Sequence, residues 1–145
     1  MPNIIKLAIV GLDTSHTIQF TKLIQGDPPA GMKVEGLRVV KAMRFPSPFQ
    51  SEKDQDGRQA QLEKWGVTVT RSLEEAAADA SALMLEINDP ALHLQYFKQA
   101  AELGKPIFLD KPLAGTFEDG QAICELARKK RCRSGGLHPC GLPRS

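Results

Sequence analysis

Residues 4–16 read IIKLAIVGLDTSH and contain the pattern that decides the fold. Residues 4–10 form an apolar run that is too short and too rich in β-branched side chains for a helix, so they predict a buried strand. Gly11 ends this strand, and apolar residues at helical spacing between positions 15 and 25 predict a helix directly after it. A strand, a glycine turn and a helix in this order begin a doubly wound α/β fold.

The same alternation continues along the chain. Further apolar runs predict strands at 37–43, 67–70, 82–87 and 106–109. Helices are predicted at 58–65, 72–78, 89–104 and from 116 onward, whereas the polar segment 46–57, with two prolines, is predicted to be a loop. These alternations predict an α/β class protein with a doubly wound, mostly parallel Rossmann-type sheet, helices on both faces, and one domain spanning residues 1–130.

Two of the helices have a defined apolar face. In the helix predicted from Asp89, the residues at helical spacing are Leu92, Tyr96, Ala100 and Leu103. The last helix is expected to be capped by Thr116, and its inner face to carry Phe117, Ile123, Leu126 and Ala127. We expect these side chains to pack against the sheet.

The composition excludes several classes of protein. The chain has 145 residues, of which 41% are hydrophobic and 25% charged, as in ordinary globular domains. No apolar run approaches the roughly 20 residues of a membrane helix, and the N-terminus lacks a secretory signal, so we expect a cytoplasmic protein without a membrane partner. A net charge of +2 without a basic stripe excludes a nucleic-acid partner. The three cysteines have no zinc-binding spacing, and no metal site is predicted.

The turn after the first strand resembles the dinucleotide motif G-x-G-x-x-G only in part. Gly11 occupies the first glycine position, but Asp13 stands at the second and His16 at the third. Two interpretations remain open. In one, the Asp13 carboxylate merely caps the following helix. In the other, the Thr14 and Ser15 hydroxyls donate to a dinucleotide while Asp13 turns aside, and His16 either contacts the cofactor or packs on the sheet.

Four stretches farther along read NDPALH (88–93), GKP (104–106), DKPLA (110–114) and TFED (116–119). In their order and in the elements between them they resemble the Gfo/Idh/MocA family, which includes glucose–fructose oxidoreductase and inositol dehydrogenase. The likeness covers residues 4–130. It implies that the chain is the NAD- or NADP-binding domain of an oxidoreductase that acts on a sugar or polyol.

The resemblance also implies roles for individual residues. Lys111 matches the family lysine near the nicotinamide and substrate, and Pro112 the frequently cis proline that directs it. Asp110 replaces the family glutamate, His93 matches a histidine after the fourth strand, and Asn88 replaces a threonine near the nicotinamide. An ammonium beside a reacting hydroxyl can stabilise negative charge and relay a proton. Without the resemblance, Lys111 would be a solvated turn lysine and His93 a surface or hydrogen-bonded structural histidine.

The choice between NAD and NADP is expected to depend on the end of the second strand. NAD-binding proteins usually place an acidic residue there, but residues 38–46 contain none. Arg44 would suit the 2′-phosphate of NADP. Arg44 can equally be interpreted as an exposed loop arginine, so the choice between NAD and NADP stays open.

The last segment, residues 131–145, breaks the pattern because it contains three glycines, two prolines and no β-branched residue. We expect a disordered or loosely docked tail. A truncated or out-of-frame coding sequence is one hypothesis for its origin, and the sequence leaves this question open. Family members continue with a domain that forms the substrate pocket. We therefore expect a truncated chain that binds dinucleotide but is inactive alone. The alternatives are a non-enzymatic module that acts through self-association or a protein partner, and an enzyme whose site spans a homo-oligomer.

Overall fold

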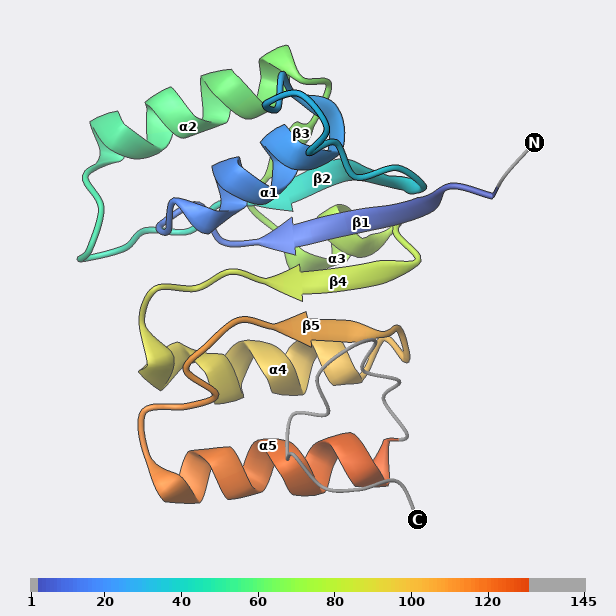
Figure 1. Cartoon of the computed structure of the whole chain (residues 1–145). Coiled ribbons are helices and arrows are strands. Elements are labelled where there is room, and N and C mark those ends of the chain that lie inside the picture. The colour runs from blue at the N-terminus through green and yellow to red at the C-terminus, as the bar shows by residue number, and fades with distance from the viewer. Residues whose placement is uncertain (1–2, 131–145) are drawn as a thin grey trace.

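The computed structural model describes residues 3–130. Its strands are β1 (Ile5–Val10), β2 (Leu37–Met43), β3 (Thr68–Thr70), β4 (Ala82–Leu85) and β5 (Ile107–Leu109). They form one sheet in the order β3-β2-β1-β4-β5, and every pairing is parallel (Figure 1). The predicted doubly wound α/β sheet is confirmed. Because the strands are parallel, their carboxyl ends all lie on one edge, which is where such folds bind ligands.

Helices cover both faces of this sheet. They are α1 (His16–Gln25), α2 (Glu52–Lys64), α3 (Leu73–Ala77), the 3-10 turn η1 (Pro90–Leu92), α4 (His93–Ala101) and α5 (Phe117–Lys129). On one face Ile24 of α1 and Leu62 of α2 pack with β1 and β2 side chains. On the other, residues of α3, α4 and α5 form a second cluster that includes Phe97 and Ile123. None of the helices within residues 3–130 is long and apolar enough to cross a membrane.

The central strand β1 has buried apolar side chains on both faces of the sheet. Ala8, Ile9 and Val10 are completely buried, with Ile9 in one cluster and its two neighbours in the other. Side chains of a strand alternate between faces, so a continuous apolar run is needed when helices cover both. Burying a side chain such as that of Ile9 stabilises the fold by about 1.5–3 kcal/mol.

The start of α2 was predicted wrongly. We expected a loop up to residue 57, but the helix begins at Glu52. The Ser51 hydroxyl caps it by accepting from the Asp54 N–H at 3.1 Å, and the acidic residues of the first turn favour the positive end of the helix dipole. The helix is polar almost throughout, with only Gln55 and Leu62 buried, so no apolar stripe revealed it.

The predicted apolar faces of the last two helices need correction. Phe117 is 80% exposed, because it is the first residue of α5 and projects from the helix end; Ile123 and Ala127 are buried as expected. Residues 90–92 form a 3-10 turn, so the α-helix starts at His93, and its fully buried residues are His93, Phe97, Ala100 and Ala101. Of the predicted face, Ala100 is buried, while Leu92, Tyr96 and Leu103 are partly buried and pack against the same cluster. The tail predicted at 131–145 lies outside the described residues.

Candidate functional site

The turn after β1 requires a glycine. Gly11 has φ +113°, and its N–H donates to the Met43 carbonyl of β2 at 2.9 Å. A Cβ atom at this position would lie 2.2 Å from the carbonyl oxygen of Glu86, the residue after β4. The chain therefore crosses the carboxyl end of the neighbouring strand at a distance that no side chain allows.

Asp13 does not cap α1. Its side chain is buried, with one carboxylate oxygen accepting from the Ser47 hydroxyl at 2.8 Å and the other from the Asn88 N–H at 3.0 Å. The capping interpretation of this residue is therefore wrong. The carboxylate is turned aside, and it connects the first turn to the loops that follow β2 and β4.

At the amino end of α1, neither Asp13 nor the N-cap residue caps the helix, and the Thr14 hydroxyl binds only the first N–H. The N-cap residue Ser15 is exposed and its hydroxyl makes no cap hydrogen bond, while the Thr14 hydroxyl accepts from the His16 N–H at 3.2 Å. Thr17 is buried and donates to the Gly11 carbonyl at 2.8 Å. Uncapped N–H groups and the helix dipole attract anions to such an end.

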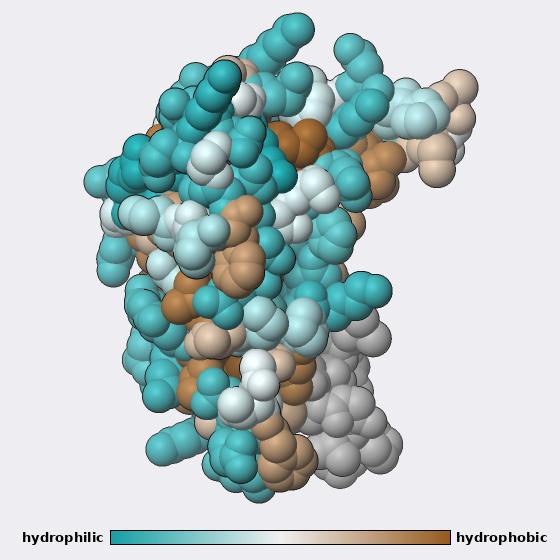
Figure 2. Space-filling view, turned by 90° about the vertical axis from the view of Figure 1, so that its left-hand side faces the viewer, coloured by the Kyte–Doolittle hydropathy of each residue, from teal (hydrophilic) through white to brown (hydrophobic). Residues whose placement is uncertain are grey.

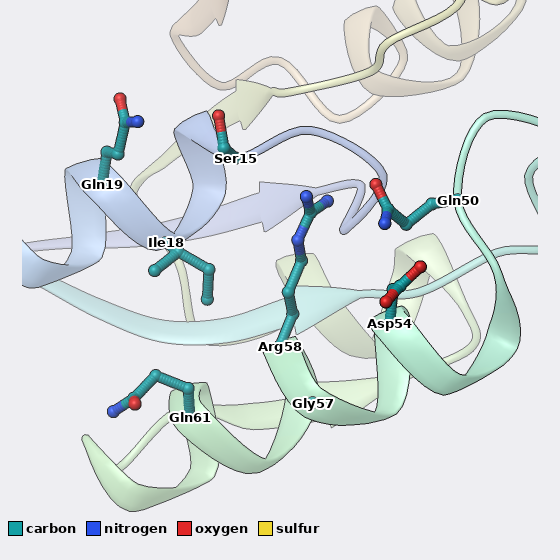
Figure 3. Close-up of a pocket in the computed structure, with 8 residues that line it drawn as sticks. All are labelled: Ser15, Ile18, Gln19, Gln50, Asp54, Gly57, Arg58 and Gln61. Carbon is teal, nitrogen blue, oxygen red and sulfur yellow. The ribbon is translucent and has the colours of Figure 1, made fainter.

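A groove of about 450 Å³ begins at this helix end and runs toward α2 (Figure 3). Arg58 of α2 extends into it and donates to the Leu12 carbonyl at 2.7 Å, which holds the guanidinium near the first turn. Asp54 also lines the groove, but its carboxylate accepts from Ser51 at 2.6 Å. The groove is lined by Ser15, Ile18, Gln19, Gln50, Asp54, Gly57, Arg58 and Gln61. Sequence reasoning missed Arg58, because only the tertiary packing of α2 brings this residue to the first turn, 46 residues away in the sequence.

The second turn of the site follows β5. The Lys111-Pro112 peptide bond is cis, as the family resemblance implied for this proline. Lys111 is exposed, and its backbone N–H donates to one carboxylate oxygen of Asp110 at 2.9 Å. The other oxygen of Asp110 contacts Nδ1 of His16 at the start of α1. This contact joins the glycine turn and the lysine–proline turn, so the two predicted motifs share one edge of the sheet.

Glu86, which the sequence analysis did not single out, lies between these turns. It is completely buried, and neither carboxylate oxygen makes a hydrogen bond of normal geometry within the described part of the chain. Burial, with Asp110 beside it, raises the pKa of Glu86 to about 10. Burial opposes ionisation of Asp110 as well, but contacts with Glu86, His16 and the Lys111 N–H lower its pKa overall. The sequence did contain one signal that could have identified Glu86, since it is the single carboxyl residue in the apolar run 82–87.

His93 supports the turns from inside. It is completely buried, with Nε2 2.8 Å from the Ile87 carbonyl oxygen and Nδ1 3.2 Å from that of Leu113. The interpretation of His93 as a surface residue is therefore wrong, whereas its interpretation as a hydrogen-bonded structural histidine fits these contacts. Asn88 is exposed at the same edge, where its backbone holds Asp13.

Arg44 follows β2 directly but is not an exposed loop residue. Only 3% of its side chain is accessible, and its guanidinium donates to the carboxylates of Asp56 and Glu52 at 2.7 Å and to Gln59 at 2.9 Å. Two carboxylates outweigh one guanidinium, so this end of β2 does not have the positive charge that a 2′-phosphate would need. Both acidic residues belong to α2, outside the segment where the sequence was searched for them.

The whole carboxyl edge is mostly hydrophilic, with brown apolar side chains in small groups (Figure 2). The edge therefore offers mainly polar contacts around the two turns. Such an edge suits a charged, polar ligand with limited apolar parts.

Comparisons with known proteins agree with this geometry. Residues 50–136 match the sequence model of GFO_IDH_MocA, described as an oxidoreductase family with an NAD-binding Rossmann fold. The scyllo-inositol 2-dehydrogenase (NAD(+)) of Bacillus subtilis (strain 168) is 25% identical over 129 residues, which are 89% of this chain and 34% of that protein.

Solved structures show the same fold. Biliverdin reductase from Synechocystis sp. PCC 6803, in complex with biliverdin and NADP+, is 21% identical, with a TM-score of 0.64 over 88% of this chain and 35% of that one. The WlbA dehydrogenase of Bordetella pertussis, in complex with NADH and UDP-GlcNAcA, is 19% identical, with a TM-score of 0.63 over 89% and 33%. The chain thus spans about a third of the length of the relatives it matches.

Proposed function

Since the chain belongs to the GFO_IDH_MocA oxidoreductase family with its NAD-binding Rossmann fold, we propose that it is the cofactor-binding part of an enzyme that oxidises or reduces a sugar or polyol. The observation that carries this proposal is the convergence of two turns on one edge. The Gly11 turn and the Lys111 turn meet there through the contact between His16 and Asp110. An elongated dinucleotide can reach both turns along this edge.

The pyrophosphate is proposed to lie at the amino end of α1. The Ser15 and Thr14 hydroxyls and the uncapped N–H groups supply donors, and Arg58 supplies a positive charge beside them. Asp13 is compatible with this arrangement, because its carboxylate accepts two hydrogen bonds away from the helix end. Arg44 is proposed to hold the β2–α2 loop rather than a phosphate, since its guanidinium is already paired.

The nicotinamide is proposed to lie near Lys111 and to supply the hydride acceptor or donor when bound. The exposed Lys111 side chain would then stand beside the substrate hydroxyl. As a neutral amine it would take the hydroxyl proton while the hydride leaves the carbon, and the ammonium so formed would stabilise the negative charge that develops on the oxygen. Asp110 is a positioning residue in this account. Its carboxylate, held by His16, accepts from the Lys111 N–H and fixes the backbone from which the lysine extends.

We further propose that the chain alone binds dinucleotide without turning over substrate. This proposal is supported by the chain's share of about a third of its relatives' length, and in it the single sheet with its helices supplies the cofactor side of a site. Orienting a substrate against the nicotinamide can contribute roughly 7–11 kcal/mol toward lowering a reaction barrier. A cofactor side without an opposing wall does not provide that orientation.

A non-enzymatic module that self-associates is the second candidate, favoured by several exposed apolar side chains. Phe49 and Phe117 lie near the carboxyl edge, and Ile4, Ile5, Met32 and Val34 near the amino edge. Because the two sets lie at opposite ends of the strands, they do not form one continuous patch. Absence of dinucleotide binding in the experiment below would favour this candidate over the first.

Arg58→Ala is expected to weaken binding of NADH and NADPH about tenfold, because it removes one charge-assisted hydrogen bond to the pyrophosphate. Calorimetric titration of the full chain measures this change. Arg128→Ala is the matched control, since Arg128 is exposed in the last turn of α5, and it should bind both dinucleotides as the unmodified chain does. Equal affinities of Arg58→Ala and the control would contradict the assigned phosphate position.

A further inference from the structure

Three possible metal ligands meet at the carboxyl edge, namely Nδ1 of His16 and the carboxylates of Glu86 and Asp110. One ligand atom from each lies within 4.8 Å of those of the other two. Glu86 is completely buried, and neither of its carboxylate oxygens makes a hydrogen bond of normal geometry within residues 3–130, although Asp110 lies beside it. A buried carboxyl group without well-formed hydrogen bonds is costly, so its position beside two further ligands calls for a physical reason.

We propose that His16, Glu86 and Asp110 form a binding site for a first-row divalent transition-metal ion. A divalent cation neutralises two carboxylates, and a neutral imidazole completes the ligand set. The imidazole distinguishes this set from the all-oxygen sites that Mg²⁺ and Ca²⁺ prefer. The proposal concerns binding alone and does not depend on the dinucleotide.

The ligands come from elements whose relative positions the sheet fixes. Leu85 of β4 pairs with Leu109 of β5, so Glu86 and Asp110, one residue farther along each strand, emerge side by side. The Asp110 N–H donates to the Leu85 carbonyl at 3.2 Å, and the Glu86 N–H to the Val10 carbonyl at 2.9 Å. Two carboxylates thus start from a rigid base, which favours a defined coordination geometry.

The third ligand, His16, can adjust its position and leaves a path by which an ion reaches the site. His16 is the first residue of α1, and 39% of its side chain is exposed, compared with 14% for Asp110. Metal–nitrogen and metal–oxygen bonds of about 2.0–2.2 Å place opposite ligands about 4 Å apart, so a small rotation of the imidazole brings the three atoms to one ion. An ion can enter from the His16 side, because Glu86 itself is inaccessible.

In the described part of the chain, the cluster has no lysine or arginine partner. Within residues 3–130, neither Glu86 nor Asp110 forms an ion pair with a lysine or an arginine. Arg58 donates to Leu12, and Arg44 pairs with residues of α2. The two carboxylates therefore remain available to a metal ion.

The test is a titration of the tag-free full chain with Mn²⁺ after treatment with a chelator, followed by the paramagnetic resonance signal of free Mn²⁺. Mn²⁺ is the probe because it favours oxygen and nitrogen ligands over sulfur ligands, and the chain contains three cysteines. We expect one bound ion per chain. Glu86→Gln and His16→Ala should each weaken binding about tenfold or more, whereas Glu118→Gln, a matched change at an exposed residue of α5, should leave it unchanged.

Each result decides the proposal. If the unmodified chain binds no Mn²⁺ at millimolar concentration, or if both variants bind it like the control, the site does not exist. Circular dichroism checks the fold of the variants. Should Glu86→Gln fail to fold, the test relies on His16→Ala, because the His16 side chain is 39% exposed and its ring neighbour Phe20 is itself only partly buried. Dinucleotide titrations measure a different ligand, so failure of this site leaves the proposed function in place.

Discussion

Gly11→Ala is expected to destabilise the folded chain by about 4 kcal/mol or to prevent folding. The added Cβ would lie 2.2 Å from the Glu86 carbonyl oxygen, and the residue would have to keep φ +113°. Relief requires β1 and β4 to separate at the edge where the two turns meet. Urea denaturation followed by far-UV circular dichroism measures the loss of stability.

Gly36→Ala is the control that separates the clash from backbone strain. Gly36 has φ +86°, but nothing lies within 4 Å of an added Cβ. We expect this substitution to cost about 1 kcal/mol. Equal losses for the two substitutions would show that the close approach of Gly11 to β4 does not hold the edge together.

Glu86→Gln is expected to stabilise the metal-free chain by about 3 kcal/mol at pH 7. The pKa of Glu86 is raised from its ordinary value of 4.5 to about 10 in the folded state. Between these values the unfolded chain releases the proton while the folded chain keeps it, so stability falls as pH rises through this window. At pH 7 the difference is 7 − 4.5 = 2.5 pH units, each worth about 1.4 kcal/mol. Glutamine has the same shape and no proton to lose, so it removes this cost.

The pH dependence distinguishes this effect from a change in packing. Below pH 4.5 the glutamate is protonated in both states, so the variant and the unmodified chain should have nearly equal stability there. The gain should then grow steadily toward pH 8, measured by urea denaturation in the presence of a chelator. A gain that is the same at pH 4 and pH 8, or a loss at pH 8, would contradict the raised pKa.

Much of the fold was predictable from local patterns. β1 and β2 were predicted almost to the residue, because a sheet covered on both faces needs continuous apolar strands. The caps of α3 and α5, Ser72 and Thr116, were also predictable, since a hydroxyl that accepts from the N–H three residues on has a local signature. The Rossmann topology then followed from the alternation of strand and helix.

The rest was hidden because it depends on tertiary contacts. His16 and Asp110 are far apart in the sequence, and only the strand order brings their side chains together. Arg44 was interpreted either as a ligand of a 2′-phosphate or as an exposed loop arginine, because its partners Glu52 and Asp56 lie on a helix whose first turn has no apolar signal. Glu86 did carry a signal, a carboxylate within the apolar run 82–87, but its neighbours could not be identified from the sequence.

The glycine amides provide the most direct test of the central claim, that the carboxyl edge of the sheet holds the dinucleotide. Gly11 follows β1 and Gly115 lies beyond the lysine–proline turn, whereas Gly36 and Gly104 precede β2 and β5 at the opposite edge. In a titration with NADH followed by amide nuclear magnetic resonance, the Gly11 and Gly115 signals should shift together while those of Gly36 and Gly104 stay in place. Saturating NADH that moves no signal, or only those of Gly36 and Gly104, would contradict the account.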